Sequence, residues 1–216
     1  MWSSAPVRRG PEAGRPRAAR LGFVLRPGMR VGLFGGSFDP AHEGHAHVAR
    51  TARTRLGLDK VIWLVAPQNP LKRGRPADLA QRMAAVRRLA AGPSAVVSDV
   101  EARLGVRYTL DLVRILKARF PGVHFVWIMG ADSLAGFHRW RGWADILRLV
   151  PVLVVARPGA VLGAGLPPAA RRFGAARRPP RLARSLPLAA PPAWIYLPAP
   201  LHHASSTELR MEQKGP

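Results

Sequence analysis

The sequence predicts an α/β protein with an open, doubly wound, Rossmann-like parallel sheet and helices on both of its faces. Three observations lead to this prediction. Short apolar runs alternate with segments of helical periodicity along most of the chain. The apolar runs are continuous, as expected of strands that are buried on both faces. The length of 216 residues suits one domain with a sizeable core.

Each predicted strand is a short apolar run that is followed by glycine, proline or a charged residue. These runs are 31–34, 61–66, 95–98, 123–129, 152–156 and 194–197. Each predicted helix is rich in apolar residues at helical spacing, over 46–56, 78–90, 109–120, 143–149 and 205–211. Asp78 is the expected N-terminal cap of the second helix. In sheets of this kind, ligands bind beyond the carboxyl ends of the strands.

Two regions interrupt this pattern within an expected single domain at 29–216. Residues 1–28 are rich in Arg, Pro, Gly and Ala and are expected to form a disordered basic arm. The arm lacks the apolar stretch of a secretory signal and faintly resembles an organelle transit peptide. Because Met29 comes immediately before the first predicted strand, a start at Met29, with the upstream residues assigned in error, is an equal alternative. Residues 159–192 are rich in Arg, Pro and Ala, which predicts a long loop or partly disordered insertion.

The composition is strongly basic, with 34 Lys and Arg against 12 Asp and Glu and a net charge of +22. Such a charge attracts polyanions without specificity, and both compositional drift and a selected nucleic-acid function would explain it. The chain has no cysteine, which excludes disulfides, thiolate metal sites and a cysteine nucleophile. No apolar run is long enough to cross a membrane. We therefore expect a cytoplasmic protein, and the sequence leaves a homo-oligomer open.

The most informative segment is GLFGGSFDPAHEGH, at residues 32–45. It runs from a strand through Gly35-Gly36 into a helix that begins near Glu43. Glycine lets the backbone approach a phosphate closely, and the helix start presents free N–H groups to it. His42 and His45 are three residues apart, so they share one side of the first turn. They suit stabilisation of a transferring phosphoryl group, while zinc binding would need a third ligand that no recognisable spacing supplies. His47 is expected at the surface.

Together with Asp39-Pro40, this segment resembles the GxFxPxHxGH motif of the HIGH-type nucleotidyltransferase superfamily, and in detail that of the nicotinate-nucleotide adenylyltransferases. A terminal segment at 204–210, ASSTELR, is similar to the ISSTxIR motif of the same family. The resemblance implies His42, His45 and Arg210 as catalytic residues. It also implies an ATP site made of Gly35, Gly36, Ser37, Phe38, His42, His45, Gly130, Asp132, Ser205, Ser206, Thr207 and Arg210. Hydroxyls at a helix start and an arginine one turn later suit a phosphate.

Other stretches resemble the nicotinate branch of this family. GADSL at 130–134 is similar to its GxDSL loop, in which Asp132 would accept hydrogen bonds from ribose hydroxyls. FHRW at 137–140 matches its aromatic platform, although Trp140 could equally be core packing. YT at 108–109 fits its YTxxTL element, but Leu112 replaces the second threonine and Arg107 stands where serine is common. The resemblance implies a pyridine-nucleotide site made of Ser37, Lys72, Tyr108, Thr109, Trp140 and Arg141.

Lys72 lies in PQNPLK, which resembles the family's PxxxPxK loop, and a solvated surface lysine is the alternative. The resemblance covers 30–158 and 194–210. It implies transfer of AMP from ATP to nicotinate mononucleotide, with Mg²⁺ held mainly by the ATP phosphates and no metal ligand from the protein. The attacking phosphate is already anionic, so no general base is needed. Three alternatives stay open: nicotinamide mononucleotide as acceptor, phosphopantetheine as acceptor, or a nucleic-acid-binding protein on an inactive transferase fold.

Overall fold

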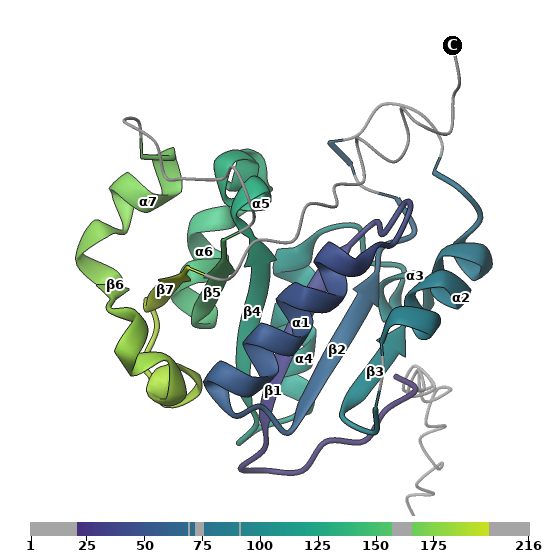
Figure 1. The fold of residues 1–216 in the computed structure, drawn as a ribbon, viewed down its shortest axis with the longest axis horizontal. Coiled ribbons are helices and arrows are strands. Elements are labelled where there is room, and N and C mark those ends of the chain that lie inside the picture. The colour runs from purple at the N-terminus through teal and green to yellow at the C-terminus, as the bar shows by residue number, and fades with distance from the viewer. Residues whose placement is uncertain (1–20, 69, 72–75, 91, 157–165, 199–216) are drawn as a thin grey trace, which may run out of the picture.

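The computed structural model describes residues 21–68, 70–71, 76–90, 92–156 and 166–198. Within these residues the chain forms a seven-stranded sheet, and every neighbouring pair of strands is parallel (Figure 1). Across the sheet the strands are ordered β3-β2-β1-β4-β5-β7-β6. Their bounds are β1 (Arg30–Gly36), β2 (Lys60–Val65), β3 (Ala95–Ser98), β4 (His124–Gly130), β5 (Val152–Val155), β6 (Arg177–Arg178) and β7 (Trp194–Leu197).

Helices cover both faces of the sheet and divide the core into two clusters. One face is covered by α1 (Glu43–Leu56), α2 (Leu79–Leu89) and the 3₁₀ helix η3 (Pro180–Leu188). The other is covered by α3 (Val100–Leu104), α4 (Thr109–Arg119), α5 (Ala131–Gly136), α6 (Trp143–Leu149) and α7 (Pro168–Arg172). Two further 3₁₀ helices are η1 (Phe137–Arg139) and η2 (Gly174–Ala176). The predicted doubly wound α/β fold is therefore confirmed.

The six predicted strands are all present within a residue or two of their expected bounds. The predicted helices at 78–90, 109–120 and 143–149 are α2, α4 and α6, and Asp78 caps α2 by accepting from the backbone N–H groups of Ala80 and Gln81 at 2.8 and 3.2 Å. Strand β6 was not predicted, because its two residues are exposed arginines. The predicted helix at 205–211 lies outside the described residues.

Residues 21–28 are not part of a disordered arm, contrary to the sequence prediction. The side chains of Leu21 and Leu25 are buried in the core cluster that contains α4, and the Phe23 ring lies 6.0 Å from the Phe120 ring. Val24, between them, is 79% exposed. This alternation of apolar side chains in the segment LGFVL is the pattern of a chain that packs one face on the protein. Figure 1 shows the segment running along the lower edge of the sheet.

The described part of the predicted insertion, 166–192, is a packed layer rather than a loop. Ala169 and Ala170 of α7 are buried against one core cluster, and Ala183 and Leu186 of η3 against the other. The indole N–H of Trp194 donates to a backbone carbonyl of this layer at 2.7 Å. The buried positions of these helices are mostly alanines and not the large apolar residues of a typical amphipathic helix, so the sequence pattern was too weak to predict them.

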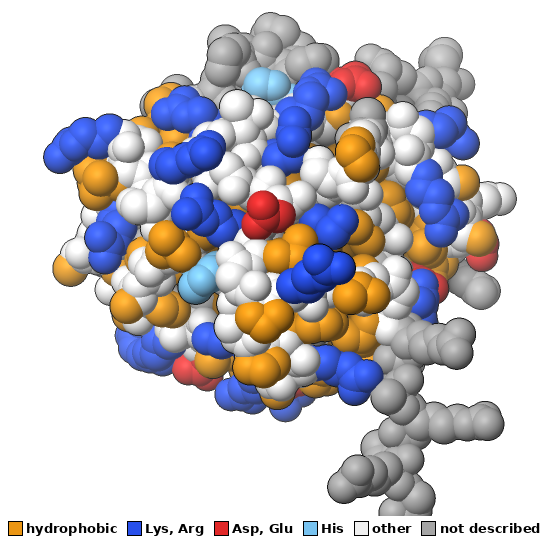
Figure 2. All heavy atoms as spheres, turned by 90° about the horizontal axis from the view of Figure 1, so that it is seen from below, with side chains coloured by type: hydrophobic (Ala, Val, Ile, Leu, Met, Phe, Trp, Pro, Cys, Tyr) orange, Lys and Arg blue, Asp and Glu red, His pale blue; other side chains and the backbone are white. Residues whose placement is uncertain are grey.

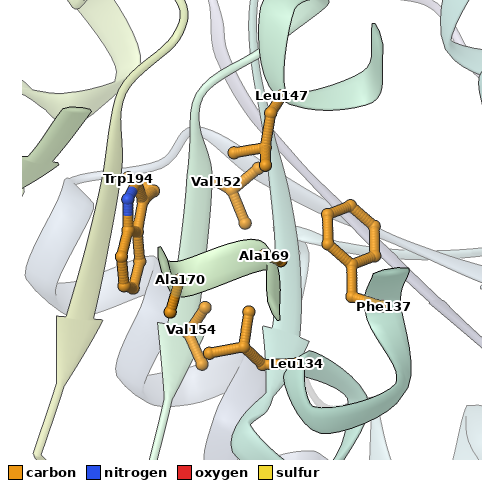
Figure 3. A pocket seen from close by; sticks show the side chains of 8 residues that line it. All are labelled: Leu134, Phe137, Leu147, Val152, Val154, Ala169, Ala170 and Trp194. Atoms are coloured by element: carbon orange, nitrogen blue, oxygen red, sulfur yellow. The ribbon is translucent and has the colours of Figure 1, made fainter. Parts of the chain in front are cut away.

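A small cavity lies beneath α7 (Figure 3). Its volume is about 10 Å³, and its lining is entirely apolar: Leu134, Phe137, Leu147, Val152, Val154, Ala169, Ala170 and Trp194. A cavity of this size holds at most one water, which would find no polar partner among these side chains. It is therefore a packing gap and not a ligand site. None of the described helices is long and apolar enough to cross a membrane.

Candidate active site

The candidate site lies where the sheet changes winding direction. Strand β1 is central and pairs with β2 on one side and with β4 on the other. The chain leaves β1 toward β2 and leaves β4 toward β5, so the two loops depart in opposite directions from adjacent strand ends. Such a switch point, at the carboxyl ends of the strands, is where open α/β sheets bind their ligands. In Figure 1 this edge is at the top.

The turn after β1 is shaped by two glycines that lie against large rings. A Cβ atom on Gly35 would lie only 2.6 Å from Cη2 of Trp127, which is itself buried in β4. A Cβ atom on Gly36 would lie 3.1 Å from Cζ of Phe38. Phe38 has a φ of +47°, a left-handed conformation that is uncommon for a side chain of this size, and it is buried against Phe34. The turn is thus packed on both faces of the sheet, by Trp127 at Gly35 and by Phe38 at Gly36.

His42 and His45 lie together at the start of α1. Their ring centroids are 3.9 Å apart, and the His42 ring is only 5% exposed. The backbone N–H of His42 donates to Nδ1 of His45 at 3.3 Å, and the backbone N–H of His45 donates to the His42 carbonyl at 2.9 Å. Because Nδ1 of His45 accepts, the proton of its neutral ring belongs on Nε2. The ring is also held edge-on by Phe38 at 5.0 Å, so its Nε2–H is a preset donor.

The end of β4 supplies the second side of the site. Gly130 is the last residue of β4 and the N-terminal cap residue of α5. Asp132 follows in the first turn of α5 and is exposed. Since Phe34 of β1 pairs with Ile128 of β4, the turn with the histidines and the start of α5 leave the sheet side by side. An exposed carboxylate at this position can accept hydrogen bonds from sugar hydroxyls.

Four of the residues expected to bind the pyridine nucleotide lie around the starts of α4 and α6, whereas Ser37 lies in the turn after β1. Tyr108 caps α4, Thr109 is its first residue, and the Arg141 guanidinium lies 4.6 Å above the Tyr108 ring. Trp140 is half-buried, with its ring edge-to-face against Phe137 at 5.2 Å and Trp127 at 6.0 Å. Trp140 therefore packs on the core, and its partly exposed ring remains able to stack with a ligand.

Comparisons with known proteins identify the family of the chain. The family model described as cytidylyltransferase-like matches residues 33–212. A probable nicotinate-nucleotide adenylyltransferase of Caulobacter sp. (strain K31) is 64% identical over 86% of this chain and 98% of that protein. One from Roseobacter denitrificans is 51% identical over 88% of this chain and 96% of that protein. The chain belongs to the nicotinate-nucleotide adenylyltransferase family.

Solved structures show the same fold at much lower identity. Nicotinic acid mononucleotide adenylyltransferase of Plasmodium falciparum, complexed with NaAD, has a TM-score of 0.64 and 15% identity over 84% of this chain and 82% of that one. The same enzyme complexed with APC has a TM-score of 0.62 and 14% identity over 85% of this chain and 83% of that one. These structures show the shared fold, while the relatives at 64% and 51% identity confirm the resemblance to the nicotinate-nucleotide adenylyltransferase family that the motifs indicated.

Several predicted site residues of this family member lie outside the described residues: Lys72, Ser205, Ser206, Thr207 and Arg210. Their roles stay predictions. His47 was expected at the surface, but it is half-buried, next to the buried residues Ala46 and Val48 of α1. In the described part of the chain, His, Asp and Glu side chains do not gather in groups of three or more that could hold a metal ion. The zinc alternative gains no support there.

One residue at this edge was missed by the sequence prediction. Arg82 of α2 is 3% exposed, and its guanidinium donates to four backbone carbonyls around the β1 turn and the loop after β2. Its position on the helix was a usable signal, because Arg82 lies four residues before the buried Val86 and therefore on the buried face. A charged residue on that face needs internal partners.

The positive charge of the protein is not confined to this site. Lys and Arg side chains are spread over the opposite, lower edge of the sheet, with few acidic side chains between them (Figure 2). Charge of this distribution attracts anionic nucleotides and other polyanions to the whole surface. The site is therefore defined by the geometry of the turns and helix starts and not by the net charge.

Proposed function

We propose that this chain transfers the adenylyl group of ATP to nicotinate mononucleotide, giving nicotinate adenine dinucleotide and pyrophosphate. The observation that carries the proposal is the close contact between the His42 and His45 rings at the start of α1, directly after the glycine turn of β1. The named relatives at 64% and 51% identity support the choice of reaction. The transfer requires that ATP and nicotinate mononucleotide, both anions, bind at one edge of the sheet. The histidines at the start of α1 can donate to the first, and the start of α4 with Arg141 can donate to the second.

The reaction forms one P–O bond and breaks another. A phosphate oxygen of nicotinate mononucleotide attacks the α-phosphorus of ATP, and the bond to the leaving pyrophosphate breaks as the new bond forms. The attacking oxygen is anionic near neutral pH, so no proton must be removed. The protein then has to align two polyanions and stabilise the charge that develops on the α-phosphate.

Each group at the site has a role in this proposal. The Nε2–H of His45 and the imidazole of His42 donate to the transferring phosphate, and the glycine turn lets the backbone approach it. Asp132 accepts hydrogen bonds from the ATP ribose. From the sequence, Lys72 and Arg210 add positive charge against the substrate phosphates, with Ser205, Ser206 and Thr207 at the ATP phosphates. A magnesium ion would arrive with ATP and be held mainly by its phosphate oxygens.

Recognition of the pyridine carboxylate is assigned to the start of α4. Helix N-termini present free backbone N–H groups and a positive dipole end, and the cap residue Tyr108 makes no side-chain hydrogen bond to its own helix. Arg141, above the Tyr108 ring, adds a positive charge beside this helix start. Both features favour the carboxylate of nicotinate over the neutral amide of nicotinamide. Trp140 supplies the stacking surface.

The deciding experiment is pyrophosphate release from ATP with three acceptors: nicotinate mononucleotide, nicotinamide mononucleotide and phosphopantetheine. We expect the highest kcat/KM with nicotinate mononucleotide. Preference for either other acceptor would refute the substrate assignment. If no acceptor supports pyrophosphate release, the assignment as an adenylyltransferase is refuted. Steeply salt-dependent RNA binding without pyrophosphate release would instead support the nucleic-acid alternative. We also propose a cytoplasmic location, since a chain without cysteine suits a reducing compartment.

A further inference from the structure

Arg82 lies inside the protein, although it is an arginine on a helix of only eleven residues near the sheet edge. Its side chain passes between α2 and the ends of β1 and β2, and it is 3% exposed. Removing a guanidinium from water is costly unless its N–H groups are satisfied by internal acceptors. The acceptors that Arg82 uses therefore show what it holds.

All the acceptors are backbone carbonyls, and they come from three segments. Nη1 donates to the Ser37 carbonyl in the β1 turn and to the Ala66 carbonyl at the end of β2, each at 2.7 Å. Nη2 donates to the Pro67 carbonyl at 3.0 Å, and Nε donates to the Ala77 carbonyl at 2.8 Å. The loop between β2 and α2 is thus held at both of its ends, and the same guanidinium holds the turn that precedes His42.

The carboxylates near Arg82 do not compete for its N–H groups. Oδ2 of Asp39 accepts from the backbone N–H of Ala77 at 3.4 Å, and Asp78 accepts from the first turn of α2. Burial lowers the pKa of Arg82, and the charges of Asp39 and Asp78 oppose that effect. Because the pKa of an arginine lies far above neutral pH, the Arg82 guanidinium stays charged. A positive charge is therefore fixed within hydrogen-bond distance of the β1 turn.

We propose that Arg82 is a positioning residue for the adenylyl transfer. It holds the histidine-bearing turn after β1 in register with the loop after β2, so that ATP and its acceptor meet at a fixed separation. This inference rests on the proposed function. Only arginine has a planar fork with donors in several directions, and the ammonium of lysine cannot reach carbonyls on three segments at once. The role is positional, because Arg82 is only 3% exposed and its N–H groups are used by backbone carbonyls.

The test compares Arg82→Met and Arg82→Lys with Val86→Ala. Val86 lies one turn further along α2 and is fully buried, but it belongs to the core and not to the loops. Its truncation lowers the melting temperature without reaching the site, so it controls for simple destabilisation. All three variants are assayed well below their melting temperatures. The measured quantities are kcat and KM with nicotinate mononucleotide, and the Kd of ATP by calorimetry.

We expect kcat to fall on the order of 10²-fold in Arg82→Met, because small misplacements of reacting groups cost about this much. Arg82→Lys, which retains the charge and part of the bonding, should recover roughly tenfold of that loss. ATP affinity should weaken in Arg82→Met, and Val86→Ala should stay within about twofold of the wild type in both quantities. If Arg82 only stabilises the fold, Arg82→Met should have a lower melting temperature but the same kcat and the same Kd for ATP as Val86→Ala.

That last pattern would overturn the proposal. If Arg82→Met does not fold, Arg82→Lys decides, and wild-type kcat and Kd in Arg82→Lys would overturn it equally. Failure of the proposed function is a different result, since the wild type would then release no pyrophosphate with nicotinate mononucleotide. In that case the Kd of ATP still reports whether Arg82 positions the turn.

Discussion

Replacing His45 with alanine should reduce turnover on the order of 10²-fold or more while the protein still folds. In the structure, Nδ1 of His45 accepts from the backbone N–H of His42 at 3.3 Å, so Nε2 carries the proton of the neutral ring. Loss of one donor that acts on a developing anion costs about 10²–10³ in kcat, or about 2.7–4 kcal/mol. Loss of the Nδ1 acceptor costs about 0.5–1.5 kcal/mol of folding stability.

Two further variants separate these effects. In His45→Asn a short amide oxygen can replace Nδ1 as acceptor, which should restore stability but not kcat. In His45→Gln the longer amide can place an N–H near Nε2, which should recover part of kcat. His47→Ala, on the same helix, is the matched control and should keep near-normal kcat. Steady-state pyrophosphate release and thermal melting measure both quantities, and near-normal turnover in His45→Ala would refute the assigned role.

Two other predictions concern the pyridine side and the core. Trp140→Ala should raise KM for the pyridine nucleotide more than KM for ATP, and equal effects on both would argue against stacking. Burial raises the pKa of Glu101 from its ordinary 4.5 to about 7. Its contribution to stability is therefore complete below about pH 4.5 and is lost as the pH rises to about 7, a loss on the order of 3 kcal/mol. Glu101→Gln should remove this loss, so urea unfolding should show a clearly larger gain for the variant at pH 8 than at pH 5; equal gains at both values would contradict the assignment.

The parts of the fold that the sequence predicted are those in which local pattern and tertiary packing agree. Buried parallel strands such as β2 and β4 are continuous apolar runs. The cap of α2 is equally local, because the Asp78 side chain accepts from backbone N–H groups only two and three residues further along the chain. The short strand β6 and the helices of the 166–192 layer have no such local pattern. The alanines of these helices become buried only because the sheet lies beneath them, which is a tertiary effect.

The site was predictable to the extent that one short segment contains its chemistry. The glycine turn, His42 and His45 lie within eleven residues, so their spacing predicted their proximity. The contact between Arg141 and Tyr108 joins residues 33 positions apart and follows from the packing of α4 against α6. The role of Arg82 depends on carbonyls of three segments, and backbone carbonyls carry no residue-specific pattern in a sequence. Contacts of that kind appear only in a folded structure.

The two halves of the site are joined through one core side chain. The ring of Trp127 lies directly beneath Gly35, where a Cβ atom would meet it at 2.6 Å, and it also meets the ring of Trp140 at 6.0 Å. The same indole therefore packs against both the turn after β1 and the Trp140 ring that is expected to stack with the pyridine. Protein cores are packed too densely for this ring to shift at one contact and not the other. Because residues that share a buried partner have coupled energies, a change at Trp127 should affect the turn after β1 and Trp140 together.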